Sequence, residues 1–202
     1  QYNVVEKCVI RDCRRAYGIG IGDGGEDIRI EDNDIERTMI YAIIVWGGGR
    51  NCMIRGNSIY ESGYYRPDTD QEYFCHGIAI DGGAGKFRGV GYHIIGNKIF
   101  DAGAAGIEVA DGVDSVVIRD NYIRRTGVKA PFDKYGIYFG GSYKPGVYAE
   151  IVNNRVFGSA WSGIRVDSNY GRFGYTSGVR VDSNVVAFSS KQGILIGCAD
   201  KI

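Results

Sequence analysis

Apolar and polar residues alternate with a period of two along most of this chain, in short runs. One run begins with a Gly-Ile pair or a close variant of it. It occurs seven times: YGIGI (17–21), YAIIV (41–45), HGIAI (76–80), AGIEV (105–109), YGIYF (135–139), SGIRV (162–166) and QGILI (192–196). Alternation over a few residues is typical of a short β-strand and differs from the spacing of a helix.

A second pattern, apolar-x-x-Asn-x-apolar, lies between the Gly-Ile runs. Its copies are IEDNDI (30–35), IRGNSI (54–59), IIGNKI (94–99), IRDNYI (118–123), IVNNRV (151–156) and VDSNVV (181–186). An earlier copy, VEKCVI (5–10), has Cys8 in the Asn position. Because the two patterns alternate, a unit of about 24 to 40 residues repeats, and a repeat of that length indicates a solenoid or a propeller.

Each unit holds about three short strands, which favours a coil of parallel β-helix over a four-stranded propeller blade. In such a coil each strand pairs with its equivalent one turn along, about 4.8 Å away. We expect the alternate residues of the Gly-Ile runs to form a continuous apolar core. We expect the Asn column to occupy a bend, with Asn in the left-handed conformation and with carboxamides hydrogen-bonded from coil to coil.

These two repeats resemble those of the right-handed parallel β-helix proteins, the pectate-lyase-like superfamily. The resemblance covers residues 1–202 and implies one all-β domain, a single-stranded solenoid of about seven coils. Repeat number and small insertions also resemble archaeal disaggregatase-type proteins, which degrade a cell-surface polysaccharide. The architecture carries lyases, hydrolases, epimerases, tailspikes and adhesins, so the fold alone does not choose a function.

Composition narrows the choice of partner. The chain has 202 residues with 24 Lys and Arg against 24 Asp and Glu, so the basic excess of a nucleic-acid-binding surface is missing. Glycine is frequent, at 32 residues against 3 prolines, as expected for many strands joined by tight turns. No apolar run approaches the roughly 18 residues of a membrane span. Five cysteines without a CxxC pair argue against a zinc site.

The chain begins inside a coil and stops just after a Gly-Ile run, without a terminal helix or polar cap. Open strand edges promote association. We therefore expect a fragment of a longer solenoid, or a chain that stacks end to end with itself. Insertions such as ESGYYRPDTDQEYFC (61–75), DGGAGKFRGVGY (81–92) and RTGVKAPFDK (125–134) flank the Gly-Ile runs. Loops on a rigid scaffold commonly carry function, and we expect these to wall a groove.

The floor of that groove would be the outward face of the Gly-Ile strands. Alternation places an elongated strip of aromatic and charged side chains there, in consecutive coils: Trp46, Asp81, Glu108, Tyr138, Arg165 and Asp167. Aromatic rings stack on sugar rings, and charged groups bind hydroxyl or carboxylate groups. We therefore predict that Trp46, Tyr138, Arg165 and Asp167 bind a polysaccharide. His76 is either a polar corner residue or a ligand at the groove edge.

Asp81 and Glu108 are the predicted catalytic pair. One strand step and two residues put their backbones about 8 Å apart, which falls in the range of inverting glycosidases. A lyase would instead need a base opposite a charge-neutralising group, and Arg165, Lys86, Arg88 or Tyr138 could serve. A calcium site from Asp81, Asp111 and Asp167 is a further hypothesis; otherwise no cofactor is expected.

Two functions follow from the sequence. The first is an extracellular or cell-surface enzyme that binds and cleaves a polysaccharide, as a glycoside hydrolase or a polysaccharide lyase. The alternative is a structural or adhesive solenoid without catalysis. An enzyme should show the strip residues clustered with a carboxyl group of raised pKa, whereas an adhesin should present an evenly solvated face.

Overall fold

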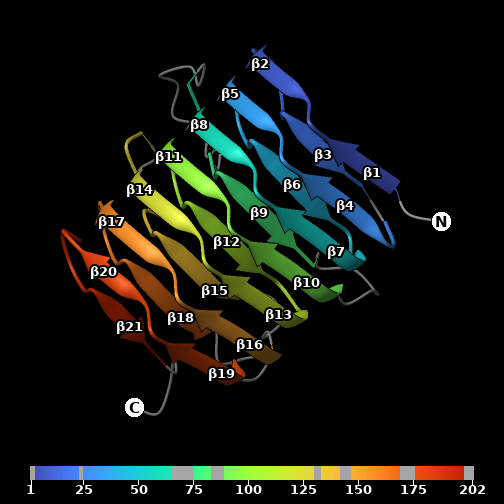
Figure 1. The fold of residues 1–202 in the computed structure, drawn as a ribbon. Helices are drawn as coiled ribbons and strands as arrows, with labels where there is room; N and C mark the ends of the chain where they lie inside the picture. Colours follow the sequence, from blue (N-terminus) through green and yellow to red (C-terminus); the bar gives the residue numbers. More distant parts are fainter. Residues whose placement is uncertain are drawn as a thin grey trace.

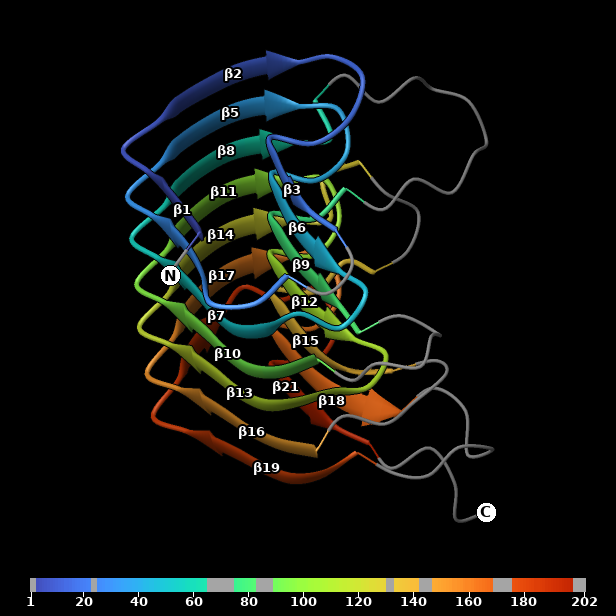
Figure 2. The ribbon, with the colours of Figure 1, turned by 90° about the vertical axis from the view of Figure 1, so that its right-hand side faces the viewer.

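The chain folds into a three-sided solenoid of seven coils (Figures 1 and 2). The computed structural model describes residues 3–22, 25–64, 75–82, 89–129, 133–141, 147–168 and 176–197. Within these ranges it contains β-strands and no helix, so none is present that could span a membrane. The predicted all-β parallel β-helix is confirmed.

Each coil contributes one strand to each of three parallel sheets. Sheet A contains β1 (Asn3–Glu6), β4 (Ile28–Glu31), β7 (Arg50–Arg55), β10 (Gly89–Ile95), β13 (Val113–Arg119), β16 (Val147–Val152) and β19 (Ser177–Asp182). Sheet B contains β2 (Val9–Cys13), β5 (Asp34–Thr38), β8 (Ser58–Ser62), β11 (Lys98–Ala102), β14 (Tyr122–Thr126), β17 (Arg155–Ser159) and β20 (Val185–Ala187).

Sheet C is built from the Gly-Ile runs. It contains β3 (Ile19–Ile21), β6 (Ile43–Trp46), β9 (Ile78–Asp81), β12 (Ile107–Ala110), β15 (Ile137–Gly141), β18 (Ile164–Ser168) and β21 (Ile194–Ile196). Its register follows the sequence columns, since Ile43, Ile78 and Ile107 pair in turn. These inward residues are buried and join one core with the inward residues of the other two sheets.

The Asn column forms a hydrogen-bonded ladder between sheets A and B. The Nδ2 of each Asn donates to the Oδ1 of the next, from Asn33 through to Asn184, at 2.9–3.0 Å. Cys8 begins the ladder, because its backbone N–H donates to Asn33 Oδ1 at 3.0 Å. The predicted stacking of carboxamides is therefore confirmed.

The predicted backbone conformation of these Asn residues is wrong. The left-handed residue is the one before each Asn, as in Asp32 (φ 55°), Gly56 (φ 66°) and Asp120 (φ 59°). The bend therefore uses a preceding Asp, Gly, Asn, Ser or Lys for the turn. This leaves the Asn carboxamide pointing inward to satisfy buried backbone groups of the bend.

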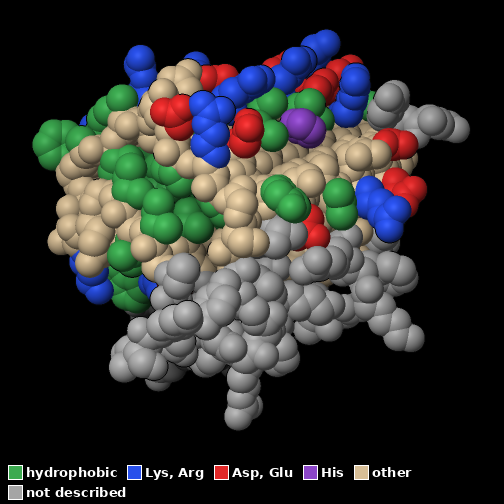
Figure 3. Space-filling model, turned by 90° about the horizontal axis from the view of Figure 1, so that it is seen from below, with side chains coloured by type: hydrophobic (Ala, Val, Ile, Leu, Met, Phe, Trp, Pro, Cys, Tyr) green, Lys and Arg blue, Asp and Glu red, His purple; other side chains and the backbone are tan. Residues whose placement is uncertain are grey.

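The last coil leaves part of the core column open. Ile194 and Ile196 of the edge strand β21 are 45% and 65% exposed. Figure 3, seen from the side of this coil, shows hydrophobic side chains gathered on the surface. End-to-end stacking stays a prediction. The insertions expected to wall the groove lie largely outside the described residues, at 65–74, 83–88, 130–132, 142–146 and 169–175.

Candidate functional site

The register of sheet C places the predicted strip on one face. Glu108, Tyr138 and Arg165 are direct neighbours on β12, β15 and β18. Two residues further along the strands, Trp46 pairs with Asp81, and Gly140 pairs with Asp167. The strip therefore exists as a surface, and its members differ in what they contact.

Trp46 lies at the end of the strip toward the N-terminal coil. Its indole packs against the ring of Tyr17, with centroids 5.6 Å apart. A Cβ atom placed on Gly20 or Gly22 would lie 3.3 or 3.6 Å from the indole. The ring thus covers the glycine positions beside β3, on the side of β6 away from Asp81.

His76 is fully buried just before β9. Its ring stacks on Tyr41 at 5.5 Å, and its Nδ1 accepts the backbone N–H of Ala105 at 3.0 Å. An Nδ1 that accepts a hydrogen bond leaves Nε2 as the protonated nitrogen. This Nε2 contacts Oε2 of Glu108, so His76 fixes the orientation of that carboxylate.

Arg165 and Asp167 form a second group on β18. The Nε and Nη2 atoms of Arg165 both contact Oδ2 of Asp167, and its Nη1 contacts the hydroxyl of Tyr135. The guanidinium carbon also lies 5.0 Å from the centroid of the Tyr135 ring. Asp167 and the surrounding rings thus hold the guanidinium in a single position, with its charge already paired.

Tyr138 is the neighbour of Arg165 on the adjacent strand and is 5% exposed. Among the described residues, its hydroxyl and Oδ1 of Asp167 are buried without a hydrogen-bond partner. Burial, and then the charge of Asp167, raise the pKa of Tyr138 far above its usual value. Burial likewise raises the pKa of Tyr135 to about 12. Both phenols therefore keep their protons over the ordinary pH range.

Asp133 is a member of the site that the sequence reasoning missed. It precedes β15 in the insertion RTGVKAPFDK, in the left-handed conformation (φ 54°). Burial, and then the charge of Glu108, raise the pKa of its carboxyl group. His76 and Arg165 lower that pKa and Asp167 raises it, so Asp133 lies within electrostatic reach of all four. The only sequence signal was the insertion itself.

Asp81 lies one strand away from Glu108, in register with Ala110. The two carboxylates act on a common neighbour: burial raises the pKa of Tyr41, and the charges of Glu108 and then Asp81 raise it further. Among the described residues, the site therefore contains one guanidinium, that of Arg165, and four carboxyl groups, those of Asp81, Glu108, Asp133 and Asp167. A carboxyl group of raised pKa beside a second carboxylate is an arrangement suited to general acid–base catalysis.

The calcium hypothesis finds no support in the described part of the chain. No group of three or more His, Cys, Asp or Glu side chains there is arranged to hold a metal ion. Oδ2 of Asp167 instead contacts the guanidinium of Arg165, so that oxygen is already paired with a cation.

Comparisons with known proteins identify the fold. A family model described as "Right handed beta helix region" matches residues 1–59 and 74–202. No curated protein matches in sequence. Among solved structures, a T265N mutant of the periplasmic alginate epimerase AlgG aligns with a TM-score of 0.64 and 16% identity, over 96% of this chain and 44% of that one.

Two further structures give the same result. The T265N T268M double mutant of AlgG aligns with a TM-score of 0.60 and 16% identity, over 95% of this chain and 41% of that one. The A-module of the Azotobacter vinelandii mannuronan C-5 epimerase AlgE6 has a TM-score of 0.51 and 12% identity, over all of this chain and 59% of that one. The chain thus spans less than two thirds of each of these proteins, and identities this low show the fold alone.

Proposed function

The chain belongs to the family of right-handed β-helix regions, and from that premise we propose that it binds and hydrolyses a polysaccharide on the outward face of sheet C. The observation that carries the proposal is that Asp133, a carboxyl group of raised pKa, lies within electrostatic reach of a second carboxylate, Glu108. A protonated carboxyl group is needed to donate a proton to the leaving oxygen, and an ionised one is needed to activate water. The raised pKa of Asp133 suits it to the first role.

Glu108 is the proposed base. It is partly exposed, with 17% of its side chain accessible, so water can reach it. The Nε2 proton of His76 holds one of its oxygens, which leaves the other for the attacking water. His76 acts through Glu108, because its own ring is buried away from any sugar.

Arg165, Asp167, Tyr138 and Trp46 are proposed to bind the sugar chain, as predicted from the sequence. Tyr135 positions Arg165, because its hydroxyl contacts Nη1 of the guanidinium while its own ring is buried. Asp81, the catalytic partner predicted from alternation, lies on the far side of Glu108 from Asp133 in strand order. It is proposed either as the alternative acid or as a ligand for sugar hydroxyl groups, and the experiment below separates the two.

Hydrolysis of a neutral chain is favoured over β-elimination by the charges in the described part of the site. Elimination from a uronate needs a cation to neutralise the substrate carboxylate and a base to remove the proton. Arg165 is already paired with Asp167, and the tyrosines have raised pKa values. The remaining carboxylates would repel a uronate.

The fold neighbours give weaker support of another kind. Proteins named as alginate and mannuronan epimerases show that this architecture is used on polysaccharides, one of them in the periplasm. An extracellular or surface location is part of the proposal for the present chain. The competing proposal, a structural solenoid without catalysis, predicts that the same carboxylates can be removed without consequence.

The test is product release from a panel of neutral and uronate-containing polysaccharides, followed by new reducing ends and by the ultraviolet absorbance of unsaturated uronides. We expect reducing ends without absorbance. Asp133→Asn and Glu108→Gln should each lower the rate by about 10²-fold or more, the usual contribution of a general acid or base. Asp34→Asn, on an exposed carboxylate of sheet B, is the matched control and should leave the rate unchanged.

Asp81→Asn decides the role of the sequence-predicted partner. A loss as large as that of Asp133→Asn would make Asp81 catalytic, whereas a raised KM at unchanged kcat would make it a binding residue. Absorbance that rises together with the reducing ends would overturn the hydrolytic assignment. Full activity in both Asp133→Asn and Glu108→Gln would show that the catalytic site does not lie at these two residues.

A further inference from the structure

A second surface of unusual composition lies on the outward face of sheet B. Each of three successive strands carries one cation and one aromatic residue, two positions apart. The order of the two is reversed on the middle strand. The register makes a chequered block of these six side chains, here called the sheet B strip: Lys98 and Phe100 on β11, Tyr122 and Arg124 on β14, and Arg155 and Phe157 on β17.

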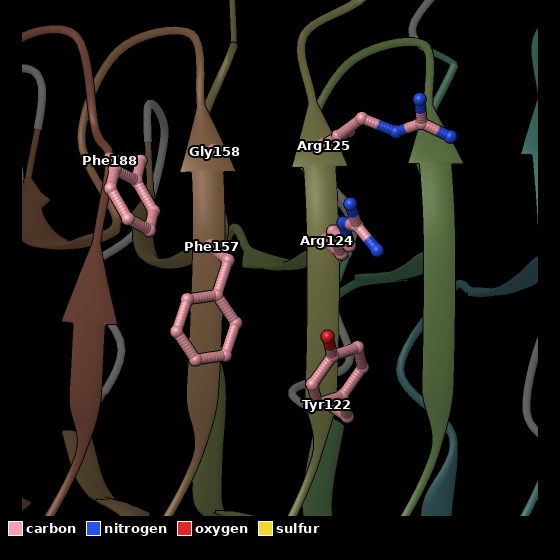
Figure 4. A pocket seen from close by; sticks show the side chains of 6 residues that line it. All are labelled: Tyr122, Arg124, Arg125, Phe157, Gly158 and Phe188. Carbon is pink, nitrogen blue, oxygen red and sulfur yellow. The ribbon is translucent and has the colours of Figure 1, made fainter.

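The rings of the strip form a continuous row. Phe100 lies 5.6 Å from Tyr122, and Tyr122 lies 5.7 Å from Phe157. Tyr60 on β8 extends the row, stacked on Phe100 at 5.0 Å. At the other end, a hollow of about 380 Å³ opens between Tyr122, Arg124, Phe157 and Phe188 (Figure 4). The protein thus presents half-buried aromatic rings along four coils.

The charges of this face are divided along the solenoid. In the first two coils, Arg11 pairs with Asp34 and Glu36, and Arg37 pairs with Asp12. In the strip, by contrast, Lys98, Arg124 and Arg155 have no ion pair among the described residues, and the neighbouring Arg125 pairs with Asp101. The excess of positive charge is therefore local, in a chain whose formal net charge is zero.

We propose that the sheet B strip binds an acidic polysaccharide, without processing it. The row of aromatic rings offers an apolar surface to the C–H groups of a sugar chain, while Lys and Arg side chains reach its carboxylate or sulfate groups. The alternation of ring and cation matches a polymer that offers an apolar face and an anionic group in every unit. The acidic site on sheet C favours a neutral chain, so the two faces take different sugars.

A single-stranded nucleic acid is the competing occupant, because such proteins also combine aromatic rings with basic grooves. The geometry disfavours it. The rings of the row pack on one another, with centroids 5.0–5.7 Å apart, so their faces are not separate platforms on which successive bases could stack.

The experiment measures equilibrium binding of the chain to four immobilised polymers. Alginate carries carboxylates, dextran sulfate carries sulfates, hydroxyethylcellulose is neutral and oligo(dT) is the polyphosphate. We expect binding to at least one acidic glycan, weakened by salt, and little binding to hydroxyethylcellulose or oligo(dT). Arg124→Gln and Phe157→Ala should each weaken that binding by about fivefold or more.

Arg11→Gln is the matched control. Arg11 lies in the same row of sheet B as Arg124, four coils away, and is already paired with acidic residues. Its substitution should change the affinity by less than about twofold. Glu108→Gln should bind the acidic glycan like the wild type, so failure of the hydrolase proposal and failure of this one give different results.

Three outcomes would overturn the proposal. The first is no binding to alginate or dextran sulfate, and the second is binding that Arg124→Gln and Phe157→Ala leave unchanged. The third is binding to oligo(dT) at least as tight as to either glycan. Sedimentation of the same variants measures their self-association. A changed oligomeric state with unchanged glycan binding would assign the strip to contacts between copies of the chain.

Discussion

Asn97 is fully buried and joins three coils through one carboxamide. Its Oδ1 accepts the backbone N–H of Asn57 at 3.0 Å and the side-chain Nδ2 of the same residue at 2.9 Å. Its own Nδ2 donates to the carbonyl oxygen of Ile54 and to Oδ1 of Asn121. Because water cannot reach these groups, each depends on the ladder for its partner.

Asn97→Ala should therefore be strongly destabilising. It leaves the two Asn57 donors without an acceptor, and we expect the free energy of unfolding to fall by about 2–4 kcal/mol. Urea unfolding of wild type and variant measures this. The matched control is Asn184→Ala at the partly exposed end of the ladder, where water replaces the lost partner and about 1 kcal/mol or less is expected. Equal losses at the two positions would contradict the account.

Asp133 makes a prediction about stability and pH. Its pKa is raised in the folded chain, so folding favours the protonated form. The stabilisation from this group is complete below the usual carboxyl pKa of about 3.9 and is lost as the pH rises through the raised value. Asp133→Asn removes the charge, and it should be more stable than wild type at pH 7.

The advantage of Asp133→Asn should shrink as the pH is lowered toward the usual carboxyl pKa. Thermal unfolding of both proteins across this interval tests the sign. Asp34→Asn provides the comparison, since Asp34 is exposed and paired with Arg11. An Asp133→Asn variant that is less stable than wild type at neutral pH would show that its surroundings do not disfavour the ionised carboxylate.

At the scale of elements, the site depends on how closely β15 and β18 approach each other. A Cβ atom on Gly140 would lie 1.8 Å from the backbone oxygen of Asp167 and 2.8 Å from the hydroxyl of Tyr138. The strand position opposite Asp167 therefore requires glycine. Without a side chain there, the two strands keep their register while Arg165 and Asp167 occupy the outward face.

Gly140→Ala should push β15 away from β18 and displace the pair of Arg165 and Asp167. We expect a loss of about 1–3 kcal/mol in the free energy of unfolding, typical of overpacking, together with lower activity. Gly193→Ala is the control, because nothing lies nearer than 3.9 Å to the added Cβ atom. A Gly140→Ala variant as stable and active as the control would contradict the packing described here.

The strands and their register could be predicted from the sequence because each coil repeats the same inward positions. Ile43, Ile78 and Ile107 are stacked as the Gly-Ile repeat requires. The exposure of the outward positions was less predictable. Ala79 and Tyr138 lie on the outward side, as alternation predicts, but they are only 4% and 5% exposed. Alternation assigns a side to a residue, and what covers that side depends on neighbouring coils.

The candidate site could be predicted only where it coincides with a repeat position. Glu108 and Arg165 occupy the same position of the Gly-Ile repeat, so the register of sheet C places them two strands apart on one face. Asp133 belongs to an insertion of irregular length, and no repeat position relates it to Glu108. The contact of His76 with Glu108 was also hidden, because a corner residue can turn either toward solvent or into the coil.

At the scale of the whole molecule, the solenoid separates two chemistries on two of its three sides. Sheet C carries the carboxyl groups of the proposed hydrolytic site. Sheet B carries aromatic rings among cations that have no ion pair within the described residues. Because both are outward faces of one rigid core, each can be altered without disturbing the other. If the sheet B strip bound an acidic polysaccharide, the site on sheet C would lie on another side of the solenoid and would stay open to a second polysaccharide.

The measurement that tests the central claim most directly is mass spectrometry of the products formed in H₂¹⁸O, from whichever polysaccharide in the panel the wild-type chain shortens. Hydrolysis adds one water across the broken bond, so each new reducing end should carry one ¹⁸O atom, and Glu108→Gln should form little of this product. Products without ¹⁸O, in which the new non-reducing end is one water lighter than hydrolysis would leave it, would mean elimination. Either that result or labelled product at the wild-type rate from Glu108→Gln would contradict the mechanism proposed for this face.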